Sequence, residues 1–469
     1  MKTRILVSFV LIIFTLACNM PFTLFSGAQT DATGEMDTST TIQPNTAVDT
    51  PVGASSSFSD PQLSDEVLMP ADLEYLGAFR LPEESGGSNW EYSGRGLTFY
   101  PDGDPSGIAD GYPGSLFGVG HDHQQFVSEI SIPAPVNSRN LDDLATAETL
   151  QPFSDITDGM FGETELPRLG LQYLPPQGAQ LTGKLHFVHG QHFQDFEPSH
   201  GWSELDLSHS SPAGPWFLNG YTNYATSDYV FEIPENWVAA LPGSPRLVTG
   251  RFREGVWGGL GPALFAYNPW TEGDPPATNA TLHTVTPLLL YGIQEPGMTD
   301  IVSDETTMMN GYLEPDHWVD GVWLTASDKS AVVFVGTKAL GNAWYGFANG
   351  VVWEYDCADQ TPATCPDVPD WPYDNRGYWA DDYQPRIIFF NPSDLVAVAN
   401  GKSETWHPQP YASMDLSSFF YDPETNIEEY KQDIAGAMAF DREHGLLYVV
   451  ERLADDYKSV IHVWRIRID

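Results

Sequence analysis

The sequence predicts an all-β fold, a single β-propeller of about seven blades, with six as the alternative. Short apolar segments bounded by turns recur roughly every 40–60 residues, the spacing of a repeated blade. Gly and Pro are plentiful, at 42 and 37 residues, and aromatic residues make up 13% of the chain. Many short strands joined by tight turns need this composition. A pair of β-sandwiches is the competing architecture.

The strand pattern is clearest at the two ends of the folded region. Strands are expected at 96–100, 114–119 and 127–132, and again at 436–441, 445–450 and 460–466. Partial copies lie at 183–188, 216–218 with 229–233, 261–267, 332–335 and 386–390. The N-terminal segment 75–81 has no neighbouring partner in the sequence. We expect it to close the ring beside 460–466, because closure removes exposed strand edges.

The start of the chain, residues 1–17, resembles a signal peptide. Lys2 and Arg4 precede an apolar run from Ile5 to Ala17, which is shorter than the roughly 20 residues that cross a bilayer. The segment before Cys18 resembles a lipobox, in which a small residue precedes a cysteine that becomes lipidated. We therefore expect an exported lipoprotein, anchored to the cell envelope at Cys18. A secretory signal cut near Ala28 is the alternative, and it also exports the protein.

Two regions are expected after this leader. Residues 18–69 are rich in Ser, Thr, Pro and Asp and poor in large apolar residues. They cannot bury enough surface to fold, so they form a disordered tether. Residues 70–469 form the propeller domain. No later segment has the length and hydrophobicity of a transmembrane helix, so the lipid alone would attach the protein to a membrane.

The charge of the chain narrows the class of partner. Its net charge is −43, from 21 basic and 64 acidic residues. Nucleic acid is excluded, because phosphate binding needs a basic face.

Two cysteines follow Cys18. Cys357 and Cys365 are eight positions apart in a polar loop that contains Pro. In an oxidising compartment, such a pair is expected to form a disulfide that holds the loop. A metal site is the weaker alternative, because no histidine lies nearby in the sequence.

Candidate site residues follow from the geometry of an antiparallel blade. The end of its second strand and the start of its first strand lie at the same edge, so both open on one face around the channel. Basic residues and histidines are scarce, at 21 and 12, yet several occupy such positions, beginning with Arg95 at a strand entry. The candidate catalytic residues are His123, His189, His192, Tyr221, Tyr224, Arg251 and Arg253. The candidate substrate-binding residues are His121, Asn219, Lys338 and Trp344.

Histidines, tyrosines and arginines follow one another in this order at the expected blade mouths, and one turn reads Gly120-His121-Asp122-His123. In these features the chain resembles the propeller-type polysaccharide lyases that cleave ulvan. The resemblance covers the whole domain from Pro70. It implies β-elimination from an anionic, uronate-containing polysaccharide.

The implied reaction assigns a role to each type of side chain. Arg251 or Arg253 would clamp the uronate carboxylate with a planar guanidinium. His123 or His192 would take the neighbouring proton, as a general base with an ordinary pKa of about 6.5. A tyrosine, Tyr221 or Tyr224, would protonate the leaving oxygen. No cofactor is required.

Several alternatives remain open. A non-catalytic surface propeller that binds a glycan or a protein partner fits the same composition. Trp344 with Tyr345 predicts a sugar-stacking platform, with buried blade aromatics as the alternative. His121 and His123 are spaced to ligate a metal from one face of a strand, with loop histidines bonded to backbone as the alternative. The segment 102–111 alternates oxygen ligands like a calcium loop but lacks the distal glutamate of an EF-hand, so an acidic hairpin is the alternative.

Overall fold

The computed structural model describes residues 66–467, apart from 195, 254, 256, 296, 354–356, 358–364 and 423–427. The expected signal peptide at 1–17, the lipidation site Cys18 and most of the tether expected at 18–69 lie outside these residues. The described parts of 63–354 and 366–469 form one compact unit, whereas Cys357 and Cys365 belong to another.

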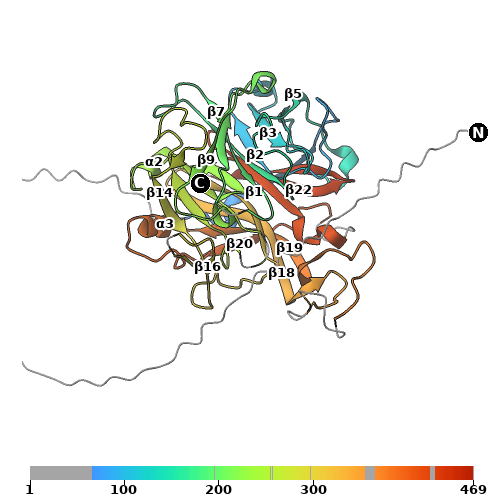
Figure 1. The fold of residues 1–469 in the computed structure, drawn as a ribbon. Helices are drawn as coiled ribbons and strands as arrows, with labels where there is room; N and C mark the ends of the chain where they lie inside the picture. Colours follow the sequence, from blue (N-terminus) through green and yellow to red (C-terminus); the bar gives the residue numbers. More distant parts are fainter. Residues whose placement is uncertain are drawn as a thin grey trace, which may run out of the picture. The chain divides into compact units, whose positions relative to one another are not determined.

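The described residues of the large unit form a ring of five small sheets, which resembles a five-bladed β-propeller (Figure 1). Blade 1 contains β2 (Leu97–Tyr100), β3 (Ser115–Val119), β4 (Val127–Ser131) and β5 (Thr149–Ser154). Blade 2 contains β6 (Arg168–Leu174), β7 (Lys184–Gly190), β8 (His200–Ser203) and β9 (Ala213–Leu218), with β13 (Thr281–Leu282) added beside β9. Blade 3 contains β10 (Tyr229–Glu232), β11 (Leu247–Gly250), β12 (Leu264–Tyr267) and β14 (Val285–Leu289).

The ring is completed by two larger blades. Blade 4 contains β17 (His317–Ala326), β18 (Lys329–Phe347), β19 (Arg376–Phe390) and β20 (Ala412–Asp415). Blade 5 contains β21 (Ala435–Asp441), β22 (Leu446–Asp455), β23 (Lys458–Ile466) and β1 (Leu73–Arg80). The first strands β2, β6, β10, β17 and β21 contact one another in this order, and β21 contacts β2. These five strands therefore line the inside of the ring.

The N-terminal strand closes the last blade, as the sequence predicts. β1 pairs antiparallel with β23, with Leu73 opposite Ile466 and Arg80 opposite Val460. This pairing joins the two ends of the described chain within one sheet. It satisfies the strand edge that β23 would otherwise expose.

The predicted blade count of seven, or six, is wrong, because single blades of this protein use long stretches of chain. β18 and β19 are 19 and 15 residues long. The segments expected as separate copies at 332–335 and 386–390 are neighbours in blade 4, where Val335 pairs with Ile387. Conversely, the segments 216–218 and 229–233 were expected to form one copy, but the first lies in blade 2 and the second in blade 3. Apolar runs therefore recur more often than blades do.

The hydrophobic core lies between neighbouring blades. Alternate residues of β18 point to its two faces. Val332 and Phe334 pack in one apolar cluster, while Val333 and Val335 pack in another. All four are fully buried, which explains an unbroken apolar run where a half-exposed strand would alternate. Burial of each such side chain contributes about 1.5–3 kcal/mol.

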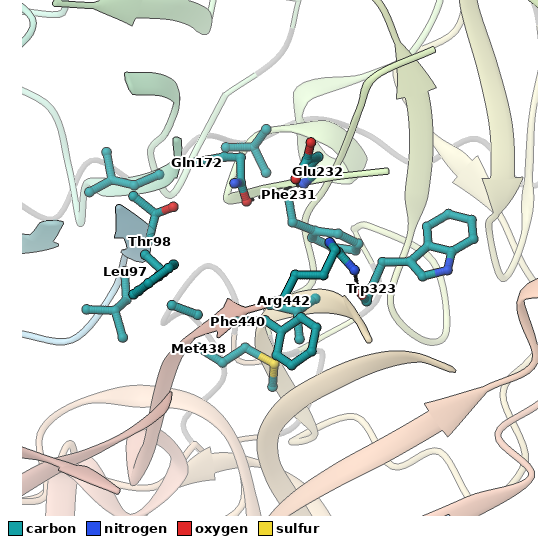
Figure 2. A pocket seen from close by; sticks show the side chains of 15 residues that line it. Leu97, Thr98, Gln172, Phe231, Glu232, Trp323, Met438, Phe440 and Arg442 are labelled. Carbon is teal, nitrogen blue, oxygen red and sulfur yellow. Dashed lines mark hydrogen bonds between the residues drawn. The ribbon is translucent and has the colours of Figure 1, made fainter. Parts of the chain in front are cut away.

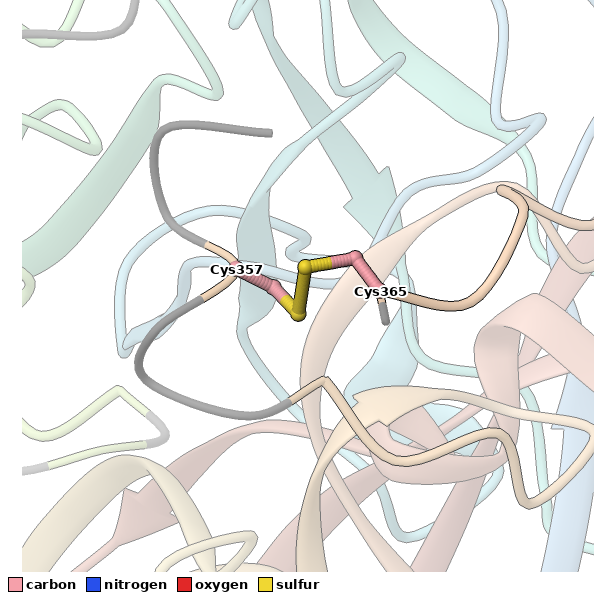
Figure 3. Close-up of a disulfide and its surroundings, with 2 residues drawn as sticks. All are labelled: Cys357 and Cys365. Atoms are coloured by element: carbon pink, nitrogen blue, oxygen red, sulfur yellow. A yellow bond between two sulfur atoms is a disulfide. The ribbon is translucent and has the colours of Figure 1, made fainter. Parts of the chain in front are cut away.

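The predicted disulfide is confirmed. Cys357 and Cys365 are joined by an S–S bond, with their Cα atoms 5.5 Å apart (Figure 3).

Helices are short throughout the described residues. The α-helices are α1 (Asn223–Thr226), α2 (Glu235–Val238) and α3 (Pro392–Ala399). Across the part of the chain that the structure describes, no helix has the length and apolar character needed to cross a membrane.

Candidate functional site

Each inner strand begins beside a charged or titratable residue. Arg168 and His317 are the first residues of β6 and β17. Arg95, Asp228 and Asp433 come one or two residues before β2, β10 and β21. The inner strands all start at the same end of the ring, so these residues surround one mouth of the channel.

The second strands return to the same end and add further charges. Asp122 follows β3, Arg251 and Arg253 follow β11, and Arg452 lies in β22. We call these nine residues the charged mouth: Arg95, Asp122, Arg168, Asp228, Arg251, Arg253, His317, Asp433 and Arg452. Ion pairs join residues of different blades within it.

One half of the charged mouth is built around Asp433. Its carboxylate accepts two hydrogen bonds from Arg95, of 3.1 and 2.8 Å. Nδ1 of His317 lies 2.7 Å from Oδ1 of Asp433, and Nη1 of Arg452 lies 3.5 Å from Oδ2. Burial alone would raise the pKa of Asp433, but Arg95 and the other cations outweigh it and hold that pKa well below its usual range. Arg452 also donates to Asp122, at 2.7 Å.

The other half is built around Asp228, which is 1% exposed. Arg253 donates to both of its carboxylate oxygens, at 2.9 and 2.8 Å. Arg168 and Arg251 approach the same carboxylate at 3.4 and 3.8 Å. Burial would raise the pKa of Asp228, yet the arginines, Arg253 first, hold it far below its usual range. Gly190 leaves room for the carboxylate of Asp228, because a Cβ at position 190 would lie only 2.3 Å from its Oδ1.

The charged mouth is locally positive in a strongly acidic protein. Five guanidinium groups face three carboxylates in it, whereas the whole chain carries −43. Arg168 is compensated by one long contact. Among the described residues its ion pair is the 3.4 Å contact to Asp228, whereas Arg251 adds two hydrogen bonds to backbone carbonyls to its own 3.8 Å contact. Burial first, and then repulsion from Arg95 and Arg253, lowers the pKa of Arg168 well below its ordinary value, so an added anion here would be stabilised.

Exposed aromatic rings lie beside the arginines. Trp257 and Phe193 are 55% and 57% exposed, and their ring centroids are 6.3 Å apart. Tyr224 is 5.3 Å from Trp257, and the guanidinium of Arg251 lies 5.0 Å from the Tyr224 ring. We call Phe193, Tyr224 and Trp257 the aromatic rim. It joins the charged mouth through Arg251.

The structure brings together five of the sequence-predicted catalytic residues: His189, His192, Tyr224, Arg251 and Arg253. Both arginines are already bound to protein. Arg251 donates to the carbonyl oxygens of Gln191 and His192, at 2.8 and 2.9 Å. Arg253 holds Asp228 and donates to the carbonyl of Leu166, at 3.0 Å. Neither guanidinium is therefore presented as an open clamp.

The histidines of this group differ in exposure. His189 is 5% exposed and stacks on Phe161, with centroids 4.0 Å apart. Burial first, and then Arg253, lowers the pKa of His189 to about 4, so its imidazole is neutral at pH 7. His192 is half-buried, and its Nδ1 lies 3.7 Å from Glu165.

His121 and His123 lie on the same mouth but on the neighbouring blade. They flank Asp122 in the loop after β3, with ring centroids 5.5 Å apart. The backbone N–H of His123 donates to Nδ1 of His121, at 3.2 Å. This contact matches the alternative of loop histidines bonded to backbone.

The remaining predicted residues lie further from the arginines. Tyr221 packs on Phe265, with centroids 4.4 Å apart, inside an apolar cluster, so the structure favours Tyr224 over Tyr221 at the mouth. Asn219 is exposed after β9, which is the fourth strand of blade 2 and not a second strand. Lys338 is buried and donates to Asp316, at 2.7 Å.

Sequence reasoning missed most of the charged mouth, including Arg168, Asp228, His317 and Asp433. The signal was a charged or titratable residue at the start of each buried inner strand or within two residues before it, as at Arg95. Such residues are rarely buried unless paired, so their repetition at five strand starts predicts a shared ionic cluster.

The channel behind the mouth is narrow. A pocket near its opposite end, lined by Gln172, Glu232 and Arg442 among others (Figure 2), encloses about 30 Å³. This is room for roughly two water molecules. Arg442 donates there to the carbonyl of Trp323, at 3.0 Å. This pocket, as formed by the described residues, is therefore too small to hold a sugar ring.

Side chains that could ligate a metal are scattered among the described residues. No group of three or more His, Cys, Asp or Glu side chains is placed there to hold a metal ion. In the candidate calcium loop, Asp104 accepts hydrogen bonds from the backbone and hydroxyl of Ser106, at 2.8 and 2.7 Å, as in an acidic hairpin that caps its own turn.

The chain matches no protein-family model. No curated protein matches its sequence either.

Proposed function

We propose that the charged mouth binds the acidic groups of an anionic polysaccharide outside the cell. One observation carries the proposal: five arginines face three aspartates at one mouth of a chain whose net charge is −43. The fold holds this excess positive charge in place, and an anionic ligand would be attracted to it. The resemblance to ulvan-cleaving propeller lyases supports the same class of ligand.

Arg168 is the residue that we assign to first contact with the ligand. Its planar guanidinium matches a carboxylate or a sulfate in a bidentate geometry. Arg95 and Arg253 already have close bidentate carboxylate partners. Arg168 has a longer contact of 3.4 Å and, unlike Arg251, has no hydrogen bond to a backbone carbonyl among the described residues, so it gains most from a new anion.

The aromatic rim supports a sugar in preference to a small inorganic anion. Trp257 and Phe193 are exposed by more than half, although exposure of large aromatic side chains costs solvation free energy. The apolar face of a sugar ring covers such surfaces while its acidic group reaches the arginines. Nucleic acid would need a larger basic face.

Binding measurements with polymers of known charge test this proposal. We expect polygalacturonate or chondroitin sulfate to bind and neutral dextran not to bind. Arg168→Gln should weaken binding about 10- to 100-fold, because a hydrogen bond to a charged group contributes about 1.5–3 kcal/mol. Arg467→Gln is the matched control, since Arg467 is exposed and pairs with Glu74, at 3.3 Å, at the other end of blade 5. Equal affinity for dextran, or no effect of Arg168→Gln, would reject the proposal.

Cleavage by β-elimination is the second candidate, and His189 favours it. A neutral imidazole at His189 could take the proton next to a uronate carboxylate that Arg168 neutralises. The electron pair of that C–H bond would form the C=C bond as the glycosidic C–O bond breaks. Tyr224 would protonate the departing oxygen. Ultraviolet absorbance of the unsaturated product across the same polymers tests this step, and a polymer that binds without any absorbance increase would leave binding as the function.

A further inference from the structure

Blade 4 extends past the charged mouth as a two-stranded hairpin. β18 and β19 stay paired beyond Thr337, which lies opposite the first residue of β17, as far as Phe347 opposite Arg376. A pocket of about 320 Å³ opens beside this extension, within the range of roughly 300–1,000 Å³ for small-molecule sites. Its lining includes Trp344, Trp379, Asp381, Asp382, Tyr383 and Lys431.

Three aromatic side chains form the apolar part of this pocket. Trp344 and Trp379 are opposite each other on the paired strands, so their side chains share one face of the hairpin. Trp344 is half-buried, and its indole N–H donates to the carbonyl of Phe347, at 3.1 Å. Trp379 is 5% exposed, and its buried indole nitrogen has no hydrogen-bond partner among the described residues. Tyr383 is 8% exposed.

Two carboxylates add hydrogen-bond acceptors. Asp381 accepts from the backbone and side-chain nitrogens of Asn342 through a single oxygen, Oδ2, at 2.8 and 2.7 Å. Asp382 accepts the backbone N–H of Tyr383 through Oδ1, at 2.9 Å. Each carboxylate has about four acceptor sites, so acceptor capacity remains at both for donors of a ligand.

This combination selects one class of ligand. Aromatic faces cover the C–H face of a sugar ring, while carboxylates accept hydrogen bonds from its hydroxyl groups. Asp381 and Asp382 would repel an anionic ligand, and Lys431 offsets part of their attraction for a cationic one. A neutral pyranose has neither conflict.

We propose that the hairpin pocket binds a neutral sugar residue. Ile434, which also lines the pocket, directly follows Asp433 of the charged mouth. The two sites are therefore adjacent, and one polymer can occupy both. This last step rests on the proposed function, and it defines the substrate as a heteropolysaccharide that contains acidic and neutral residues.

Titration of the full chain with methyl glycosides of glucose, galactose, mannose and xylose tests the pocket, with tryptophan fluorescence and NMR shifts as readouts. We expect at least one glycoside to bind with a millimolar Kd. Trp344→Ala should weaken that binding about tenfold, as loss of an aromatic contact does. Trp371→Ala is the matched control, because Trp371 is 76% exposed and does not line the pocket. Circular dichroism and Tm establish that both variants fold.

The failures of the two proposals can be told apart. A glycoside that binds while no acidic polymer does would reject the charged mouth as a binding site and keep the pocket. No response of the wild-type chain to any of the four glycosides at tens of millimolar would overturn the pocket proposal. Stronger binding of choline than of every glycoside, or undiminished binding by folded Trp344→Ala, would also overturn it.

Discussion

Arg253 holds Asp228 through two hydrogen bonds, of 2.9 and 2.8 Å, at the mouth of the channel. The two residues come from the end of one strand and the start of another in blade 3. Because Asp228 is 1% exposed, its charge depends on this partner. Loss of Arg253 would therefore leave a buried carboxylate less well compensated.

We expect Arg253→Ala to lower the free energy of unfolding by about 3–5 kcal/mol, because removal of one partner leaves a buried charge uncompensated. Urea denaturation at pH 7 measures this change. Arg467→Ala, which removes an exposed arginine, should change stability by at most about 0.5 kcal/mol. Equal stability of the two variants would show that Arg168 and Arg251 are sufficient partners for Asp228.

Two buried histidines should make stability depend on pH. Burial lowers the pKa of His186 and of His200 to about 3, while unfolded histidine titrates near ~6.5. Because the pKa is lower in the folded state, the stability that each neutral histidine contributes is fully present above pH ~6.5. It is lost progressively as the pH falls toward 3, since the unfolded histidine binds a proton first. The stability gap between wild type and His200→Gln should therefore shrink by up to about 2 kcal/mol between pH 7 and 5.

The direct measurement for these histidines is an NMR titration. Their ring signals should stay constant from pH 8 to pH 5 in the folded protein. In urea, all histidines should titrate near ~6.5. Movement of either buried ring signal above pH 6 would contradict the assigned burial.

Closure of the ring should depend on the N-terminal strand. Phe79 of β1 is fully buried between blades 5 and 1. Phe79→Ala should destabilise the domain by about 3–5 kcal/mol, through lost burial and the cavity left behind. Leu181→Ala, at a position 86% exposed, provides the comparison and should leave Tm unchanged. A small effect of Phe79→Ala would mean that blade 5 is stable without β1.

Membrane attachment is predicted to depend on Cys18. In cells, Cys18→Ala should move the protein from the membrane fraction to the soluble fraction and remove the mass of the lipid. Cys357→Ala should leave the protein in the membrane fraction. Continued membrane association of Cys18→Ala would favour attachment by another route.

Part of the fold follows from local patterns. The closing segment 75–81, the strands near 96–132 and 436–466, and the disulfide between Cys357 and Cys365 were all predicted correctly. The strands follow from alternation of apolar residues and the disulfide from a short separation in the sequence, while the place of 75–81 follows from the need to cover an exposed strand edge. The number of blades depends on which strands pair and over what length. The sequence near 332–335 and 386–390 does not show that these two segments pair within one blade, as they do in the β18–β19 hairpin.

The sequence by itself determined an all-β ring closed by its N-terminal strand, because strand periodicity and turn composition are local properties. Only the tertiary structure decided which charges meet. Arg168 and Asp228 are 60 positions apart in the chain, and Arg95 and Asp433 are 338 apart. Nothing in their neighbours indicates these pairs. They exist because five blades start at one end of the same channel, where burial makes each unpaired charge costly and so selects its partner.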